Sequence, residues 1–270
     1  MAESNSGPLR GWLVQLGRSA TALIEELGYW LVLIGESLYW IAWGPFKRRP
    51  VRLAATVAEM MRIGITAVPI VFTLSFAIGV MLAIQGIYTL RQFGAETQVV
   101  LGIALSVVRE FGPLITGILV AGRTGSALAA RLGTMQVNQE IDALRVMGID
   151  PVRYLAAPVL IATVVMVPAL ALIADLSALF GGAVYCQLEL GLSHVAYWDQ
   201  ATSFITANDV TQGLQKSVVF ALIVALVGIS NGFAVTGGAE GVGRATTRAV
   251  VLSISYIVLA DMLFTYFLNR

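Results

Sequence analysis

One stretch decides the fold of this chain: residues 109–153, REFGPLITGILVAGRTGSALAARLGTMQVNQEIDALRVMGIDPVR. Its first half continues an apolar run from Gln98 that, as a helix, is long enough to cross a bilayer core of about 30 Å. Its second half carries charges among good helix formers and ends at Gly148 and Pro151. That pattern is typical of a short amphipathic helix outside the membrane. The stretch therefore predicts a membrane span followed by an extramembrane helix.

The composition is that of an integral membrane protein. Hydrophobic residues make up 57% of the 270 residues and charged residues only 12%, whereas about a quarter of an ordinary soluble domain is charged. A net charge of +1 gives no argument for a nucleic acid partner. The single Cys186 excludes an internal disulfide and a multi-cysteine metal site, and the N-terminus lacks the pattern of a removable signal peptide.

Apolar runs predict about five transmembrane helices in an all-α fold. The runs cover approximately residues 63–90, 98–122, 155–185, 213–235 and 249–268. A polar, acidic loop is expected over residues 187–212, and a glycine-rich turn, TGGAEGVGRATTR, over residues 236–248. We divide the chain into an N-terminal region, residues 1–49, and a membrane domain, residues 50–270.

The N-terminal region has two interpretations. Charged residues interrupt its apolar patches, and it is rich in tryptophan, which favours the membrane–water boundary; this predicts an amphipathic helix in the interface. However, residues 27–46 are long enough to span, with Glu36 as their one charge. The interfacial interpretation is preferred.

Basic residues predict the orientation, because they accumulate on the cytoplasmic side of membrane proteins. In the predicted topology, only Arg91 and Arg270 fall on the side opposite the cytoplasm. The residues on the expected cytoplasmic side are Lys47, Arg48, Arg49, Arg52, Arg62, Arg123, Arg131, Arg145, Arg153, Arg244 and Arg248. The N-terminus should therefore be cytoplasmic and the C-terminus on the opposite side.

Ionisable residues within the spans are candidates for function, although they can equally be structural ties between helices. They are Arg109, Glu110, Asp175, Lys216 and Asp261. Adjacent helical residues point about 100° apart, so Arg109 and Glu110 are each expected to meet a partner on another helix. We expect Glu110, Lys216 and Asp261 to form one polar cluster.

Small residues recur at every fourth position after these charges. One row is Ala121, Gly125, Ala129 and Gly133, and a neighbouring row is Gly122, Ser126, Ala130 and Thr134. Such rows let another helix approach closely. Both local packing and a functional gate remain open as interpretations.

Enzymatic machinery is not apparent. One histidine and one cysteine support no metal or nucleophile site. The segment Gly238 to Ala245 has glycines at Walker spacing, but Arg244 and Ala245 replace the lysine and hydroxyl that hold phosphate and magnesium. A cytoplasmic turn is therefore the preferred interpretation.

The extramembrane segment EIDALRVMG, residues 140–148, offers apolar residues at i, i+3 and i+6 for docking into a partner's groove. These are Ile141, Leu144 and Met147, with Glu140, Asp142 and Arg145 around them. The alternative is a solvated loop helix.

The chain resembles the MlaE family, the permease subunits of lipid-transporting ABC systems that work with MCE-domain proteins. The resemblance runs from about Pro50 onward. It is carried by REFGPLITGILVAGRTGSALAARLGTM (109–135), EIDALRVMGIDPVRYLAAP (140–158), ADLSALFGG (174–182), KSVVF (216–220) and GGAEGVGRATTRAVV (237–251).

The resemblance implies a non-catalytic homodimeric permease in the inner membrane, with a periplasmic C-terminus and a phospholipid cavity. ATP and magnesium would be held by two separate ATPase subunits. A coupling helix formed by Glu140, Ile141, Asp142, Leu144, Met147 and Gly148 would contact them. A ring of MCE-domain subunits would dock outside, and the family allows a small sulfate-transporter-like accessory subunit.

Two other classes of function stay open. An ion- or proton-coupled carrier would need no ATPase and would use Glu110, Asp175 and Asp261 as a relay. A structural scaffold for a membrane complex would not contact lipid within its spans.

Overall fold

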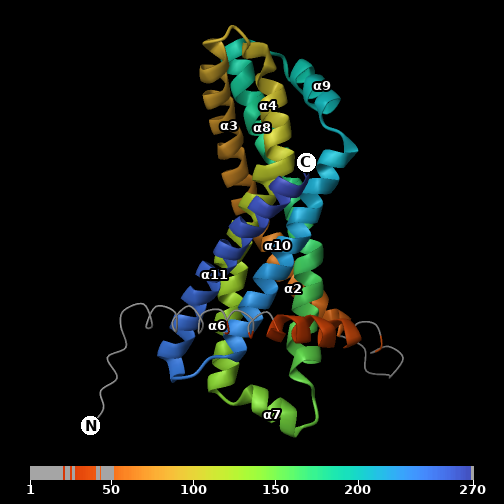
Figure 1. Cartoon of the computed structure of the whole chain (residues 1–270), viewed down its shortest axis with the longest axis vertical. Helices are drawn as coiled ribbons and strands as arrows, with labels where there is room; N and C mark the ends of the chain where they lie inside the picture. The colour runs from red at the N-terminus through yellow and green to blue at the C-terminus, as the bar shows by residue number, and fades with distance from the viewer. Residues whose placement is uncertain (1–20, 22–24, 26–27, 41–42, 44–51, 269–270) are drawn as a thin grey trace, which may run out of the picture.

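The computed structural model describes residues 21, 25, 28–40, 43 and 52–268. Every regular element among them is a helix, and five helical stretches are long and apolar enough to cross a membrane (Figure 1). The predicted all-α class with five spans is therefore confirmed. The stretches are Leu53–Arg91, Glu96–Val137, Val152–Leu190, Ala207–Phe233 and Gly238–Phe267.

Three of these stretches are assembled from several elements. The first contains α2 (Leu53–Ile63), η1 (Ile65–Ala67) and α3 (Val68–Arg91); the second contains η2 (Glu96–Gln98), α4 (Val99–Ser106), η3 (Val107–Phe111), α5 (Gly112–Val120), η4 (Ala121–Gly125) and α6 (Ser126–Val137). After α7 (Glu140–Val146) come η5 (Val152–Ala156), α8 (Ala157–Leu190), α9 (His194–Phe204), α10 (Ala207–Phe233) and α11 (Gly238–Leu268).

The prediction of a glycine-rich turn over residues 236–248 is wrong, because α11 already begins at Gly238. The connection between α10 and α11 is confined to residues 234–237. The φ angles of 84° at Gly237 and 68° at Gly238 suit glycine. Beyond them, an ion pair of 2.5 Å joins Glu240 to Arg244 at i,i+4 spacing, which supports the first turns of the helix.

The loop predicted over residues 187–212 contains a helix, α9. The Ser193 side chain accepts a hydrogen bond from the Ala196 amide at 3.2 Å and so caps its start. Tyr197 and Ala201, one turn apart, are buried in a core that α4 and α8 also form. This burial explains why the segment folds into a helix. The polar composition of the segment gave no indication of it.

α3 and α8 lie side by side at the end of the molecule that carries α9 (Figure 1). Two glycines permit their contact: a side chain at Gly79 would collide with the backbone of Ala178, and one at Gly181 with the backbone of Phe76. Ser177 donates a hydrogen bond of 2.6 Å to the Phe72 carbonyl across the same contact. We call this region the α3–α8 contact.

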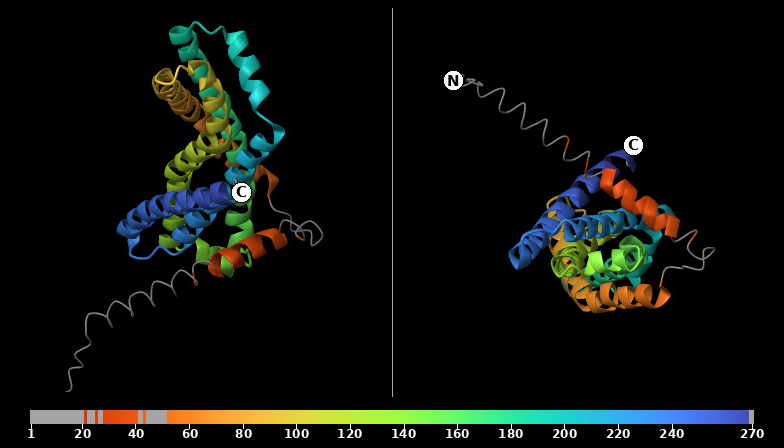
Figure 2. Two further views of the ribbon diagram at one scale, coloured as in Figure 1. Left: turned by 45° about the horizontal axis from the view of Figure 1, so that its top comes forward. Right: turned by 90° about the horizontal axis from the view of Figure 1, so that it is seen from below.

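The described part of the N-terminal segment, residues 28–40, is helical and lies across the α7 end of the bundle (Figures 1 and 2). Trp30, Leu33 and Ser37 are buried on one face, and the Trp30 indole donates to Ser230 Oγ at 3.3 Å. Exposed Leu31, by contrast, lies on the other face. This arrangement suits an interfacial helix rather than a sixth span.

Some sequence-based expectations fall on residues outside the described part of the chain. They concern most of the N-terminal region, including the basic residues Lys47, Arg48 and Arg49, and the terminal Arg270.

Candidate functional site

The second span is interrupted by two wide, π-helical turns, η3 and η4. Such turns are rare and often occur at functional sites, because the additional residue changes the direction in which neighbouring side chains point. η3 contains both Arg109 and Glu110, and η4 contains Arg123. Arg109, Glu110 and Arg123 therefore lie where the regular helix is broken, whereas Arg131 lies in the regular helix α6.

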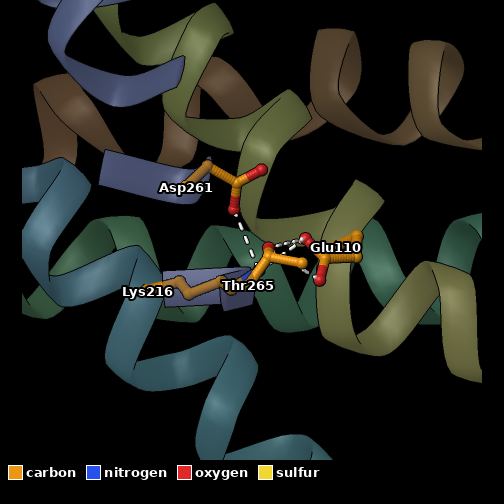
Figure 3. A network of polar contacts seen from close by, with 4 residues as sticks. All are labelled: Glu110, Lys216, Asp261 and Thr265. Atoms are coloured by element: carbon orange, nitrogen blue, oxygen red, sulfur yellow. Dashed lines mark hydrogen bonds and ion pairs between the residues drawn. The ribbon is translucent and has the colours of Figure 1, made fainter. Parts of the chain in front are cut away.

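Four side chains form the polar cluster shown in Figure 3: Glu110, Lys216, Asp261 and Thr265. Lys216 Nζ lies 2.5 Å from Glu110 Oε2 and 3.0 Å from Asp261 Oδ1. Thr265 accepts a hydrogen bond from Lys216 at 3.1 Å and donates to Glu110 Oε1 at the same distance. The cluster thus joins η3, α10 and α11, and it contains the three residues expected together, with Thr265 added.

Arg109 points to a different partner from Glu110. Its Nη2 lies 2.5 Å from Oδ1 of Asp209, in the first turn of α10. The other Asp209 oxygen accepts hydrogen bonds from the amide and hydroxyl of Thr206, at 2.7 and 2.8 Å. Sequence reasoning missed Asp209, although Thr206 and Asp209 have the spacing of a capping box before an apolar run.

Asp175 lies apart from the polar cluster. It is buried on α8, and its Oδ1 has no hydrogen-bond partner in the described part of the chain. A side chain at Gly112, which follows η3, would collide with this oxygen. Asp175 therefore contacts the helix that carries Glu110 without joining its ion pairs.

The first row of small residues, Ala121, Gly125, Ala129 and Gly133, is buried. A side chain at Gly125 would touch Val224 of α10 and Ser253 of α11, and one at Gly133 would meet Val235 and Val242. The second row is more open, since Gly122 and Thr134 are exposed. The first row therefore lies where η4 and α6 contact α10 and α11.

α7 stands at the end of the molecule opposite α9 (Figure 1). Positive φ angles of 60° at Gln139 and 73° at Gly148 bound it, so the chain turns sharply on both sides. Asp142 and Arg145 pair at 2.9 Å.

The face of α7 that is available to a partner differs from the one expected. Ile141 and Leu144 are buried within the chain, whereas Met147 is 64% exposed. Val146, which the sequence analysis did not select, is 89% exposed. The three apolar residues at i, i+3 and i+6 therefore do not form one docking face, because the chain covers two of them.

The segment Gly238 to Ala245 forms the first turns of α11 and not a loop. Because the segment is helical, most of its backbone amides donate to carbonyls of the helix. The segment therefore does not form a phosphate-binding loop. No cluster of three or more potential metal ligands occurs among the described residues.

Comparison with known proteins assigns the family. Residues 56–267 match the family model described as Permease MlaE. A probable ABC transporter permease protein of Rickettsia typhi is 34% identical over 230 residues, which cover 85% of this chain and 89% of the relative.

Two further relatives are similar. The Arabidopsis thaliana protein TRIGALACTOSYLDIACYLGLYCEROL 1, chloroplastic, is 36% identical over 212 residues, which cover 78% of this chain and 61% of the relative. The intermembrane phospholipid transport system permease protein MlaE of Haemophilus influenzae is 32% identical over 210 residues, which cover 77% and 80%. The chain therefore belongs to the MlaE permease family.

Proposed function

We propose that this chain is the membrane-spanning permease subunit of an ABC transporter that moves phospholipid between the inner membrane and the periplasmic side. The observation that carries the proposal is the family match across residues 56–267, which takes in all of η3, α7 and the polar cluster. Relatives over most of this length are named as ABC transporter permeases, and one as a phospholipid transport permease.

The energy would come from a separate ATPase subunit, which would hold ATP and magnesium in place of this chain. α7 is the proposed coupling element, because it is short and lies beyond the ends of the spans. Its exposed residues Asp142, Arg145, Val146 and Met147 are proposed to contact the ATPase, while Ile141 and Leu144 fix α7 to the permease. Movement of the ATPase would then reach α6 directly.

A homodimer is the proposed assembly. Within one chain, the side chains of Arg109 and Glu110 remain 37% and 32% exposed. Charged groups facing lipid are costly, so such groups normally face protein or a water-filled cavity. A second copy could enclose these side chains in a cavity that receives the phospholipid headgroup, with apolar walls for the acyl chains.

The positive-inside pattern supports a cytoplasmic α7 end and a periplasmic α9 end. Under this orientation, an MCE-domain ring would dock at the α9 end. A small sulfate-transporter-like accessory subunit would complete the proposed assembly. The N-terminus would be cytoplasmic and the C-terminus periplasmic.

The ion-coupled alternative is not favoured. The relatives are ABC permeases, and no hydrogen bond or ion pair among the described residues connects Asp175 with Glu110 or Asp261. A proton relay through all three would lack a continuous path.

The test is a substitution on the exposed face of α7. Val146→Asp with Met147→Asp should abolish ATPase-driven lipid transfer from reconstituted complexes, since two new charges would face the partner without disturbing the buried Ile141. Val195→Asp, at an equally exposed residue of α9, should leave co-purification of the ATPase unchanged. Normal transfer by the double variant would refute the coupling role, and transfer by the purified chain without ATPase would refute the proposed function.

A further inference from the structure

A pocket of about 100 Å³ opens at the α7 end, far from the polar cluster. It lies between α2, the π-turn η4, α6 and α8. Its polar lining consists of Glu59, Arg62, Arg123, Thr124 and Arg131, and its apolar lining of Ile63, Ala127, Leu128 and Val159. Glu110 and Arg123 are 13 residues apart in the same span, which corresponds to roughly 20 Å along a helix. The pocket is thus separate from the proposed lipid path.

The charges of the pocket do not balance. Arg131 pairs with Glu59 at 2.5 Å, and Arg62 lies 3.6 Å from the same carboxylate. Arg123 has no carboxylate partner among the described residues and donates to the Thr66 hydroxyl at 2.5 Å. Three guanidinium groups thus line the pocket with one carboxylate, and two of them share it. The pocket carries an excess of two positive charges.

The arginine side chains of this lining favour a phosphate group as the ligand. Guanidinium groups present planar pairs of N–H donors that match phosphate oxygens, and they are less strongly hydrated than ammonium groups. The pocket volume of about 100 Å³ leaves room for a tetrahedral oxyanion. Ile63, Leu128 and Val159 provide an apolar wall beside it.

We propose that this pocket binds an anionic phosphate group, carried by a phospholipid headgroup of the adjacent leaflet or present as free phosphate. The bound group would join Arg62 of α2 to Arg123 of η4 and so connect the first span to the second. This site is additional to the transport cavity and does not depend on the proposed transport function.

The test measures binding to the full-length chain in a neutral detergent. The probes are phosphatidylglycerol and inorganic phosphate, each titrated separately, with bound lipid counted by native mass spectrometry and protection followed by thermal unfolding. Arg62→Gln and Arg123→Gln should each weaken binding by about tenfold or more, the ratio expected for losing one hydrogen bond to a charged group. Glu59→Gln should tighten binding, because it releases two arginines from their carboxylate.

Arg244→Gln is the matched control. Arg244 is also an exposed arginine in an ion pair with a glutamate, on α11, but it does not line the pocket; the substitution should leave the affinity unchanged. The Arg62 side chain is 65% exposed, so its substitution should not impair folding. The Arg62→Gln and Glu59→Gln variants suffice should Arg123→Gln fail to fold.

The two probes distinguish the source of the ligand. Saturable binding of phosphatidylglycerol supports a lipid headgroup, whereas protection by millimolar phosphate without lipid binding supports the free anion. Either result, with the opposite effects of Arg62→Gln and Glu59→Gln, supports the phosphate site. Equal affinity of all variants for both probes, or weaker binding by Glu59→Gln, would overturn it.

Discussion

The α3–α8 contact and the polar cluster hold helices together by different means. In the first, Gly79 and Gly181 let two backbones meet, so the contact depends on shape. In the second, Lys216 is 2% exposed between two carboxylates, so the contact depends on charge. The polar cluster is also partly open at Glu110, whereas the α3–α8 contact is closed. The comparison shows that this bundle joins its helices both by close approach of backbones and by a buried cation whose partner Glu110 stays partly exposed.

The largest effect is expected from breaking the polar cluster. Lys216→Met leaves Glu110 and Asp261 without their cation, and removing one partner of a buried ion pair costs about 3–5 kcal/mol. We expect a strongly reduced unfolding temperature and yield of monodisperse protein in detergent. The triple variant Glu110→Gln, Lys216→Met, Asp261→Asn should recover most of the loss because no charge is left unpaired. If Lys216→Met unfolds at the same temperature as the unmodified chain, the ion pairs of the polar cluster do not stabilise the fold.

A smaller effect is expected at the α3–α8 contact. Gly79→Ala places a methyl group against the Ala178 backbone, and such overpacking costs about 1–3 kcal/mol. The matched control is Gly102→Ala on α4, where an added Cβ meets no atom and the helix should gain about 0.5–1 kcal/mol. Thermal unfolding of both variants measures the difference, and equal unfolding temperatures would show that backbone approach does not limit this contact.

The smallest effect is expected where a polar contact lies outside the spans. The Trp40 indole donates to Asp150 Oδ2 at 2.9 Å, and Arg153 lies over the Trp40 ring at 5.0 Å. Trp40→Phe removes the hydrogen bond and keeps an aromatic ring, so a loss of about 1 kcal/mol is expected.

Hydrogen exchange of the backbone amides of residues 150–156 provides the measurement for Trp40→Phe. Exchange there should become faster while exchange in α10 stays the same, because the lost contact holds only the start of the third span. Faster amide exchange throughout the chain would contradict this expectation. It would mean that the N-terminal segment stabilises the whole fold.

The sequence predicted the number of spans, the positions of the intramembrane charges and the presence of a short helix after the second span. These features depend on local composition, since about 20 apolar residues are needed to cross a bilayer whatever the rest of the chain does. The same local rule misplaced the ends of helices. The glycine-rich segment at 236–248 is helical from Gly238, supported by the Glu240–Arg244 ion pair. The polar segment at 187–212 contains α9 because of capping and burial that composition does not reveal.

The sequence grouped Glu110, Lys216 and Asp261 into one cluster, but only the tertiary structure gave the pairing of Arg109 with Asp209. Sequence alone separated Arg109 from Glu110 by their angle on a helix, but their partners Asp209 and Lys216 lie about a hundred residues away along the chain. The π-turn η3 sets the directions in which they point, and no local pattern predicts where a helix widens. The burial of Ile141 and Leu144 likewise depends on how α7 folds against the rest of the chain. Hydropathy along the chain therefore determined the number and approximate positions of the spans, and packing between distant helices determined the contacts of the polar cluster.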